Sequence, residues 1–115
     1  MTIARHDPSS ILSQAVEHGN TVYLAGIVAK NLDNDVKGQT KEILGEIDRL
    51  LAKCGSSKAK VLQAHIWVTD IRNRDAMNES WNAWTGGENL PGRACIQAAL
   101  ADPRMLVEIA VVAAK

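Results

Sequence analysis

The sequence predicts an α+β domain in which a mixed β-sheet carries two helices on one face. Two segments repeat apolar residues at helical spacing, and five others have the length and apolar pattern of strands. Their order along the chain, ββαβαββ, allows both helices to pack on the same face of the sheet. With 115 residues the chain can bury a core within one domain, so we treat residues 1–115 as a single domain.

The N-terminal half begins with a predicted β-hairpin. Residues 12–17 and 21–26 are strand-like, and they flank the short turn signal His18-Gly19-Asn20. The first helix is predicted over residues 36–54, because its apolar residues recur at helical spacing. Gly55 then provides a stop signal at the C-terminal end of this helix.

The C-terminal half is predicted to hold a strand, a helix and two more strands. The strand covers residues 61–69, and the helix runs from about residue 73 to residue 85. The two closing strands are predicted over residues 93–100 and 105–113. The helix is recognised by apolar residues at i, i+4 and i+7, which are Met77, Trp81 and Trp84.

The last predicted strand is apolar on both of its faces. Alternate residues from Val107 to Ala113 form a branched face suited to a core against the helices. The opposite face is also apolar, apart from Glu108. Because both helices cover one face of the sheet, we expect a partner subunit to cover the other. A wet, amphipathic second face is the alternative.

Two opposite charges interrupt the most apolar segments of the chain. Arg93 opens residues 93–100, and Glu108 lies within residues 105–112. A buried charge is costly unless it is paired or bound to a ligand. If these segments are neighbouring strands, Arg93 and Glu108 share one site, where a small carboxylate would bind beside a protein carboxylate. A structural ion pair between the two residues is the alternative, and the residues alone do not separate the two hypotheses.

Composition narrows the classes of partner and compartment. Thirteen basic and thirteen acidic residues cancel, which argues against nucleic acid as the main partner. The longest apolar run is far shorter than the ~20 residues that span a bilayer, and the N-terminus lacks the pattern of a signal peptide. Cys54 and Cys95 have neither CxxC nor metal-ligand spacing. They indicate reduced thiols in a cytoplasmic protein. Because no apolar run is long enough to span a bilayer, we expect no membrane contact.

The two C-terminal segments contain the most specific motif of the chain. Pro91-Gly92-Arg93-Ala94-Cys95 is followed by Val107-Glu108-Ile109 in the last predicted strand. Together with the element order, this motif resembles the reactive-intermediate deaminase family, also called the YjgF or L-PSP family, and the resemblance covers essentially the whole chain. Residues 77–81 resemble the family segment that carries an asparagine, here Asn78. Residues 20–26 resemble the family's second strand, which ends in a glycine at the pocket, here Gly26.

The resemblance implies a chorismate-mutase-like fold that assembles as a homotrimer with clefts between its subunits. Active family members hydrolyse 2-imino acids and their enamine tautomers, such as 2-aminoacrylate, to 2-keto acids and ammonia. The resemblance implies that this reaction needs no cofactor and no metal. The expected partner is therefore a small carboxylate substrate.

The resemblance also implies roles for individual residues. Arg93 is expected to bind the substrate carboxylate with its planar fork, and Glu108 to orient a water molecule and relay its proton. Backbone groups near Gly26 and Cys95 are expected to hold the imine nitrogen or neighbouring atoms. Cys95 is interpreted as a pocket wall residue. Asn78 is expected either to touch the ligand or to brace the loop before Arg93.

Three positions depart from the pattern of the well-known active members. Leu12 replaces a tyrosine, Ala25 a serine, and Ala110 the second glutamate of the last strand. Leu12 would make the pocket more apolar. These departures keep open a non-catalytic trimer that binds or senses a keto acid or amino acid. The endoribonuclease activity attributed to some relatives is the weakest hypothesis, because basic and aromatic residues are not interleaved.

Overall fold

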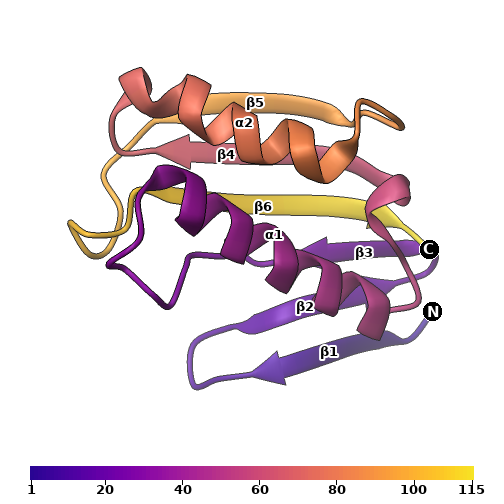
Figure 1. The fold of residues 1–115 in the computed structure, drawn as a ribbon. Coiled ribbons are helices and arrows are strands. Elements are labelled where there is room, and N and C mark those ends of the chain that lie inside the picture. Colours follow the sequence, from indigo (N-terminus) through magenta and orange to yellow (C-terminus); the bar gives the residue numbers. More distant parts are fainter.

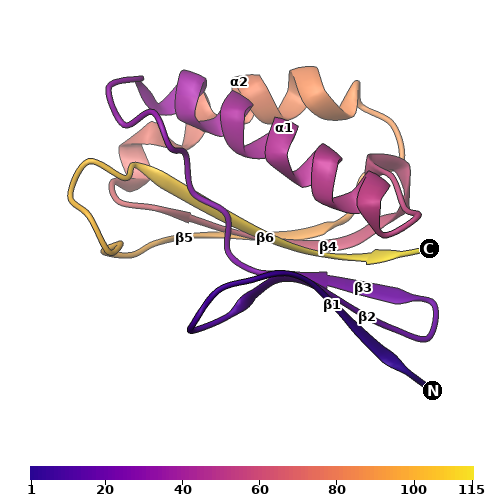
Figure 2. The same cartoon turned by 90° about the horizontal axis from the view of Figure 1, so that it is seen from below.

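A mixed six-stranded sheet forms one layer of the molecule, and two helices form the other (Figure 1). The computed structural model describes residues 1–115. The strands are β1 (Ile3–Pro8), β2 (Ser13–His18), β3 (Thr21–Leu24), β4 (Val61–Val68), β5 (Gly92–Gln97) and β6 (Val107–Ala114). The helices are α1 (Val36–Lys53) and α2 (Arg74–Thr85), with 3-10 turns at Lys58–Lys60 and Ile71–Asn73. Figure 2 shows both helices on the same side of the sheet, which confirms the predicted fold class.

The sequence prediction missed β1, the outermost strand of the sheet. This strand pairs with β2 alone, and four of its six residues, Ile3, Ala4, Arg5 and Pro8, are exposed. An edge strand of this kind buries few side chains, so it lacks the apolar alternation that marks a half-buried strand. Pro8 at its end is also typical of an edge position. The element order is therefore βββαβαββ.

The order of strands in the sheet is β1-β2-β3-β6-β4-β5, and only β4 and β5 are parallel. The connection through α2 places β5 beside β4, at the free edge opposite β1 (Figure 1). β5 ends at Gln97 and β6 begins at Val107, so both strands are shorter at the loop between them than predicted. The two closing strands are not neighbours, because β4 lies between them.

α1 covers the predicted segment and packs its apolar stripe against the sheet. The Asp35 carboxylate caps the helix by accepting the Gly38 N–H at 2.9 Å. Gly55 follows the helix with a φ of +77°, the left-handed conformation that glycine adopts freely. The apolar stripe of α1 consists of fully or almost fully buried residues: Ile43, Leu44, Ile47, Leu50 and Leu51.

Neither helix combines the length and apolar character needed to cross a bilayer.

A buried amide ties the start of α1 to the loop that leads into β6. Gln39 is fully buried, and its Nε2 donates to the carbonyl oxygens of Asn34 at 3.1 Å and Arg104 at 3.0 Å. Its Oε1 accepts the Leu106 N–H at 2.9 Å. One side chain therefore makes all three of these hydrogen bonds. Gln39 therefore fixes the position at which β6 begins.

The face of the sheet opposite the helices is open in the single chain. Tyr23 on β3 is 46% exposed and Ile96 on β5 is 54% exposed, although both side chains are large and apolar. Strand register places Ile96, Trp67 and Glu108 in one row across β5, β4 and β6 on this face. The expected cover for this face, a partner subunit, remains a prediction.

We expect Gln39→Leu to lower the free energy of unfolding by about 1–3 kcal/mol, because the Leu106 N–H and the Arg104 carbonyl lose their partner. Chemical denaturation monitored by circular dichroism measures this loss. Thr40→Val is the matched control: Thr40 is also fully buried on α1, but its hydroxyl only donates to the Val36 carbonyl of the same helix. An equal loss in both variants would contradict the role given to Gln39.

Candidate functional site

Arg93 lies on the helix-covered face of the edge strand β5. It pairs with Ala64 of β4, which pairs with Val111 of β6, and both of these residues belong to the core. The Arg93 side chain reaches α2, where its Nη1 donates to Asn78 Oδ1 at 2.7 Å. Its Cζ lies 5.3 Å from the centroid of the Trp81 ring, a cation–π contact. The guanidinium is thus half-buried and oriented from two sides.

α2 is rigidly docked where it meets Arg93. Met77 and Trp81 are buried at 0% and 4% exposure, so they anchor the helix on the sheet. Trp84 Nε1 donates to both carboxylate oxygens of Asp48 at 3.1 Å, which holds α2 against α1. Asn78 follows Met77 and turns toward β5. The amide that contacts Arg93 is therefore held by the packing of its helix.

The Arg93 guanidinium keeps most of its donors free. A guanidinium has five N–H groups, and Asn78 accepts from one of them. No carboxylate of the chain forms an ion pair with Arg93. Arg93 also lines a cavity of about 270 Å³, together with Asn78, Trp81, Leu90 and Pro91. This arrangement suits the bidentate binding of a small carboxylate.

Cys95 lies two residues beyond Arg93 on the same face of β5. It pairs with Ile66, is half-buried, and packs against the edge of the apolar core. Its thiol takes part in no hydrogen bond within the chain. This apolar packing is consistent with a wall residue.

Glu108 lies on the opposite, open face of the sheet. It pairs with Trp67 of β4, whereas the residues on either side of it in β6 are buried under the helices. Two backbone hydrogen bonds join Ile27 and Ile109, at 2.8 and 3.1 Å, and bring Gly26 against Glu108. A Cβ atom placed on Gly26 would overlap the Glu108 carboxylate. Glycine is therefore the residue that permits this contact.

The other predicted site residues lie on the Glu108 side of the sheet. Ala25 directly precedes Gly26, and its N–H donates to the Gln14 carbonyl of β2 at 2.9 Å. Ala110 is half-buried two residues beyond Glu108 on the same face. Leu12 directly precedes β2 and is 43% exposed. We call Glu108, Gly26, Ala25 and Ala110 the Glu108 group.

Within one chain, Arg93 and Glu108 do not share a site. β4 lies between their strands, and Arg93 pairs with Ala64 whereas Glu108 pairs with Trp67, three residues further along. Two strand spacings separate them by about 10 Å across the sheet, and they project from opposite faces. Both the shared site on neighbouring strands and the structural ion pair are therefore wrong for the single chain. Both hypotheses assumed that the closing strands are adjacent, and the parallel crossover through α2 prevents this.

Sequence reasoning missed one residue that positions Arg93. Trp81 is one of the apolar residues that predict the second helix, and it is buried, but one face of its ring also contacts the Arg93 guanidinium. Asn78 and Trp81 are three residues apart, so they lie on the same side of α2. That spacing was visible in the sequence. Its meaning depended on knowing that β5 lies beside α2.

Comparison with known proteins places this arrangement in a family. The family model described as Endoribonuclease L-PSP matches residues 2–115. The chain is 42% identical over 114 residues to a RutC family protein of Haemophilus influenzae, covering 98% of each sequence. It is 43% identical over 114 residues to the RutC family protein YoaB of Escherichia coli K12, covering 99% of each.

A solved structure agrees with the sequence matches. The crystal structure of a member of the YjgF protein family from Neisseria meningitidis superposes with a TM-score of 0.96 at 39% identity. The match covers 100% of this chain and 96% of that one. The shared architecture is the chorismate-mutase-like α+β fold. The chain therefore belongs to the reactive-intermediate deaminase family, known also as the YjgF or L-PSP family.

Proposed function

We propose that this protein is a cytoplasmic, cofactor-independent deaminase that hydrolyses 2-imino acids and their enamine tautomers, of the 2-aminoacrylate type, to 2-keto acids and ammonia. The observation that carries the proposal is the state of Arg93. Its guanidinium is half-buried, oriented by Asn78 and Trp81, and without a carboxylate partner in the chain. A half-buried cation with free donors is stabilised when a ligand supplies the carboxylate.

The proposed active site forms between subunits. Arg93 and the Glu108 group lie on opposite faces of one sheet, so a single chain cannot offer both to one substrate. The edge strand β5 of one subunit would instead meet the Glu108 group of the next. The exposed apolar side chains of the open face, Tyr23 and Ile96, favour such a contact. Repeated head to tail and closed as a ring of three, this contact gives a homotrimer with three equivalent clefts.

Arg93 would hold the substrate carboxylate and thereby place the imine carbon beside Glu108. Glu108 accepts a proton from a water molecule, whose oxygen bonds to the imine carbon as the C=N electron pair moves to nitrogen. The nitrogen takes up a proton from solvent, and the product of this step is a tetrahedral carbinolamine. Glu108 then returns its proton to the amino group, and the C–N bond breaks with its electron pair going to nitrogen. The hydroxyl releases its proton to solvent as the C=O bond forms, so ammonia and the 2-keto acid leave. Imine and water are thus converted to keto acid and ammonia without a redox step.

Gly26 would contribute its backbone polar groups to the site, as well as the space that the Glu108 carboxylate occupies. Its N–H and C=O form no hydrogen bond within the chain, and they lie beside the Glu108 carboxylate. Free backbone groups at this point suit the polar atoms of a reacting imine. β5 is an edge strand, so backbone groups near Cys95 also face away from the sheet.

The second candidate is a trimer that binds a keto acid or amino acid with little turnover. The observation that favours it is the composition of the Glu108 group. Ala25 and Ala110 bring no polar side chain to Glu108, which leaves one carboxylate as the only side chain of the group able to transfer a proton. Arg93 would serve either function equally. The two functions differ in what removal of the Glu108 carboxylate does.

We expect Glu108→Gln to lower kcat for 2-aminoacrylate by about 10²–10⁴-fold while 2-keto acid affinity stays within a few-fold, because only proton transfer is lost. Arg93→Ala should abolish both turnover and binding, and Arg93→Lys should lower kcat/KM about 100-fold through loss of the bidentate fork. Decay of substrate generated in situ, with calorimetric binding of the keto acid, measures these effects.

Glu79→Gln and Arg74→Ala, both exposed on α2, are the matched controls and should behave as the unmodified protein does. An unchanged rate of 2-aminoacrylate hydrolysis in Glu108→Gln would contradict the proposed mechanism. Tight keto acid binding without any turnover in the unmodified protein would favour the sensor. Comparison of 2-aminoacrylate with a bulkier apolar imine would report the preference that Leu12 imposes.

Mixed trimers test the placement of the site between subunits. When Arg93→Ala and Glu108→Gln chains are co-assembled, about one quarter of the interfaces should combine an intact Arg93 with an intact Glu108. Activity should therefore reappear from two inactive parents. A mixture of Arg93→Ala with the double variant contains no intact Arg93 and should stay inactive. Inactive mixtures, with hetero-assembly verified by native mass spectrometry, would refute the composite site.

Gly26→Ala tests the contact between Gly26 and Glu108. The added methyl group must displace the carboxylate, so we expect kcat to fall on the order of tenfold or more through misplacement of the proton acceptor. Gly45→Ala on α1 is the matched control, because a Cβ atom there meets nothing within 4 Å. That control should keep full activity and gain up to about 1 kcal/mol of stability. Full activity in Gly26→Ala would mean that Glu108 acts from another position.

A further inference from the structure

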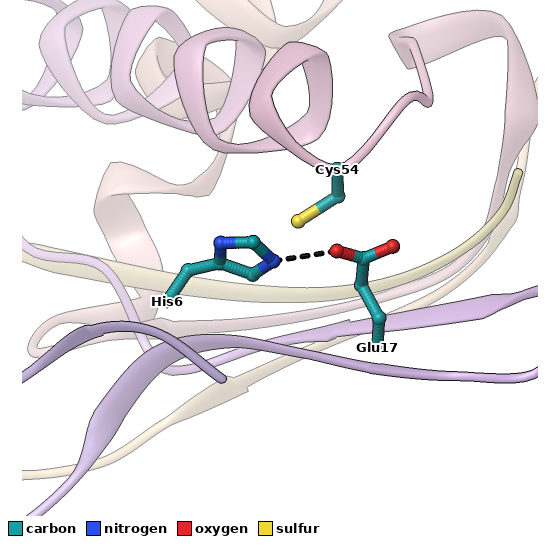
Figure 3. A group of neighbouring side chains, drawn as sticks. All are labelled: His6, Glu17 and Cys54. Atoms are coloured by element: carbon teal, nitrogen blue, oxygen red, sulfur yellow. Dashed lines mark hydrogen bonds and ion pairs between the residues drawn. The ribbon is translucent and has the colours of Figure 1, made fainter. Parts of the chain in front are cut away.

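Three side chains of metal-binding type converge under the C-terminal end of α1. His6 comes from β1, Glu17 from β2, and Cys54 directly follows α1 (Figure 3). One ligand atom from each lies within 4.8 Å of the other two. This cluster lies at the β1 side of the sheet, whereas Arg93 lies on β5 at the opposite edge. The proposed deaminase mechanism uses none of the three residues.

The strand register explains why His6 and Glu17 meet. β1 and β2 are antiparallel, with His6 opposite Ala15 and Ala4 opposite Glu17, so His6 and Glu17 are diagonal neighbours on the helix-covered face. His6 Nε2 lies 2.5 Å from Glu17 Oε2. The two side chains are 20% and 15% exposed, which leaves the pair partly shielded from water.

Cys54 completes the cluster from above the sheet. It is 3% exposed, its sulfur points toward the His6–Glu17 pair in Figure 3, and its thiol forms no hydrogen bond. The thiol therefore has no competing hydrogen-bond partner where it faces the His6 imidazole and the Glu17 carboxylate.

We propose that His6, Glu17 and Cys54 bind Zn²⁺, with a water molecule in the fourth position. Sulfur, imidazole nitrogen and carboxylate oxygen are the ligand types that Zn²⁺ takes in proteins. Tetrahedral zinc needs ligand atoms about 3.3–3.6 Å apart, so Cys54 must approach and the His6–Glu17 contact must open, each by about 1 Å. Side-chain rotation supplies movements of that size. Cys54 binds as the thiolate and releases its proton to solvent, so a thiolate and a carboxylate neutralise the charge of the ion.

Lys115 would act as an outer partner of the site. Its Nζ lies 2.5 Å from Glu17 Oε1, while Oε2 faces His6. The carboxylate can therefore keep Lys115 on one oxygen and bind the metal through the other, an arrangement that orients the ligand. Zinc bound here would join the β1–β2 hairpin to the end of α1. This proposal does not depend on the deaminase activity.

Cobalt is the spectroscopic probe for this site. Titration of Co²⁺ into the full-length, reduced and chelator-treated protein should produce a thiolate-to-cobalt charge-transfer band that saturates at one ion per chain, and Zn²⁺ should abolish it. Cys54→Ala and His6→Gln should lose the band. Cys95→Ala and His18→Gln should retain it, because Cys95 lies on β5 and His18 is exposed at the end of β2.

The outcomes separate a metal site from a hydrogen-bonded cluster. Absence of the band in the unmodified protein, or its persistence in Cys54→Ala, would overturn the proposal. Circular dichroism confirms that each variant is folded. His6→Gln gives an independent test on a half-buried edge residue, should Cys54→Ala disturb the end of α1.

Hydrogen exchange locates the effect of the metal. The three ligands are together only in the native state, so Zn²⁺ at 100 times its Kd should slow the opening of β1 and β2 by about 100-fold. Mg²⁺ should have no effect, and His6→Gln should remove the protection by Zn²⁺. Protection confined to β5 or α2, or equal protection in His6→Gln, would refute binding at this cluster.

Discussion

The alternation of side chains along β6 and β5 is the constraint on which the rest of this molecule depends. It sends Glu108 to the open face and Arg93 to the helix-covered face, with β4 between them. Neither charge finds an opposite charge in its own chain. A half-buried guanidinium without a carboxylate is tolerable because Asn78 and Trp81 stabilise it without neutralising it. The fold thereby leaves a positive charge available to a ligand, and in the proposed function the Glu108 group of a second copy completes the site.

Packing far from Arg93 and Glu108 determines how well each is positioned. α2 is fixed by Met77 and Trp81 on the sheet and by the Trp84–Asp48 hydrogen bonds to α1. On the other side, the Gln39 amide fixes the start of β6, two residues before Glu108. Both positions therefore depend on buried contacts that tolerate little displacement. A protein that relies on orientation of a small substrate benefits from such rigidity.

The sequence was most informative where burial dictates periodicity. Both helices and the central strands were predicted to within a few residues, because their apolar spacing follows from packing on one core. β1 was missed because an edge strand buries little. The adjacency assumed for the two closing strands was wrong, because a parallel crossover leaves no local signal. The family motif identified Arg93 and Glu108 individually, but not the faces on which they lie. The cluster of His6, Glu17 and Cys54 was invisible, because it joins three elements and one of them was not predicted.

The two edges of the sheet are stabilised by different means. At β5, Arg93 contacts Asn78 and the Trp81 ring of α2 and Cys95 packs against the core, whereas β1 is held to α1 through ion pairs. The Asp7 carboxylate pairs with Lys53 and Arg49 of α1, which hold its pKa at about 2. Exposed ion pairs of this kind contribute little to stability, so we expect the β1–β2 hairpin to open at low cost. A metal ion ligated by both strands and by Cys54 would add a link between this hairpin and the margin of the core.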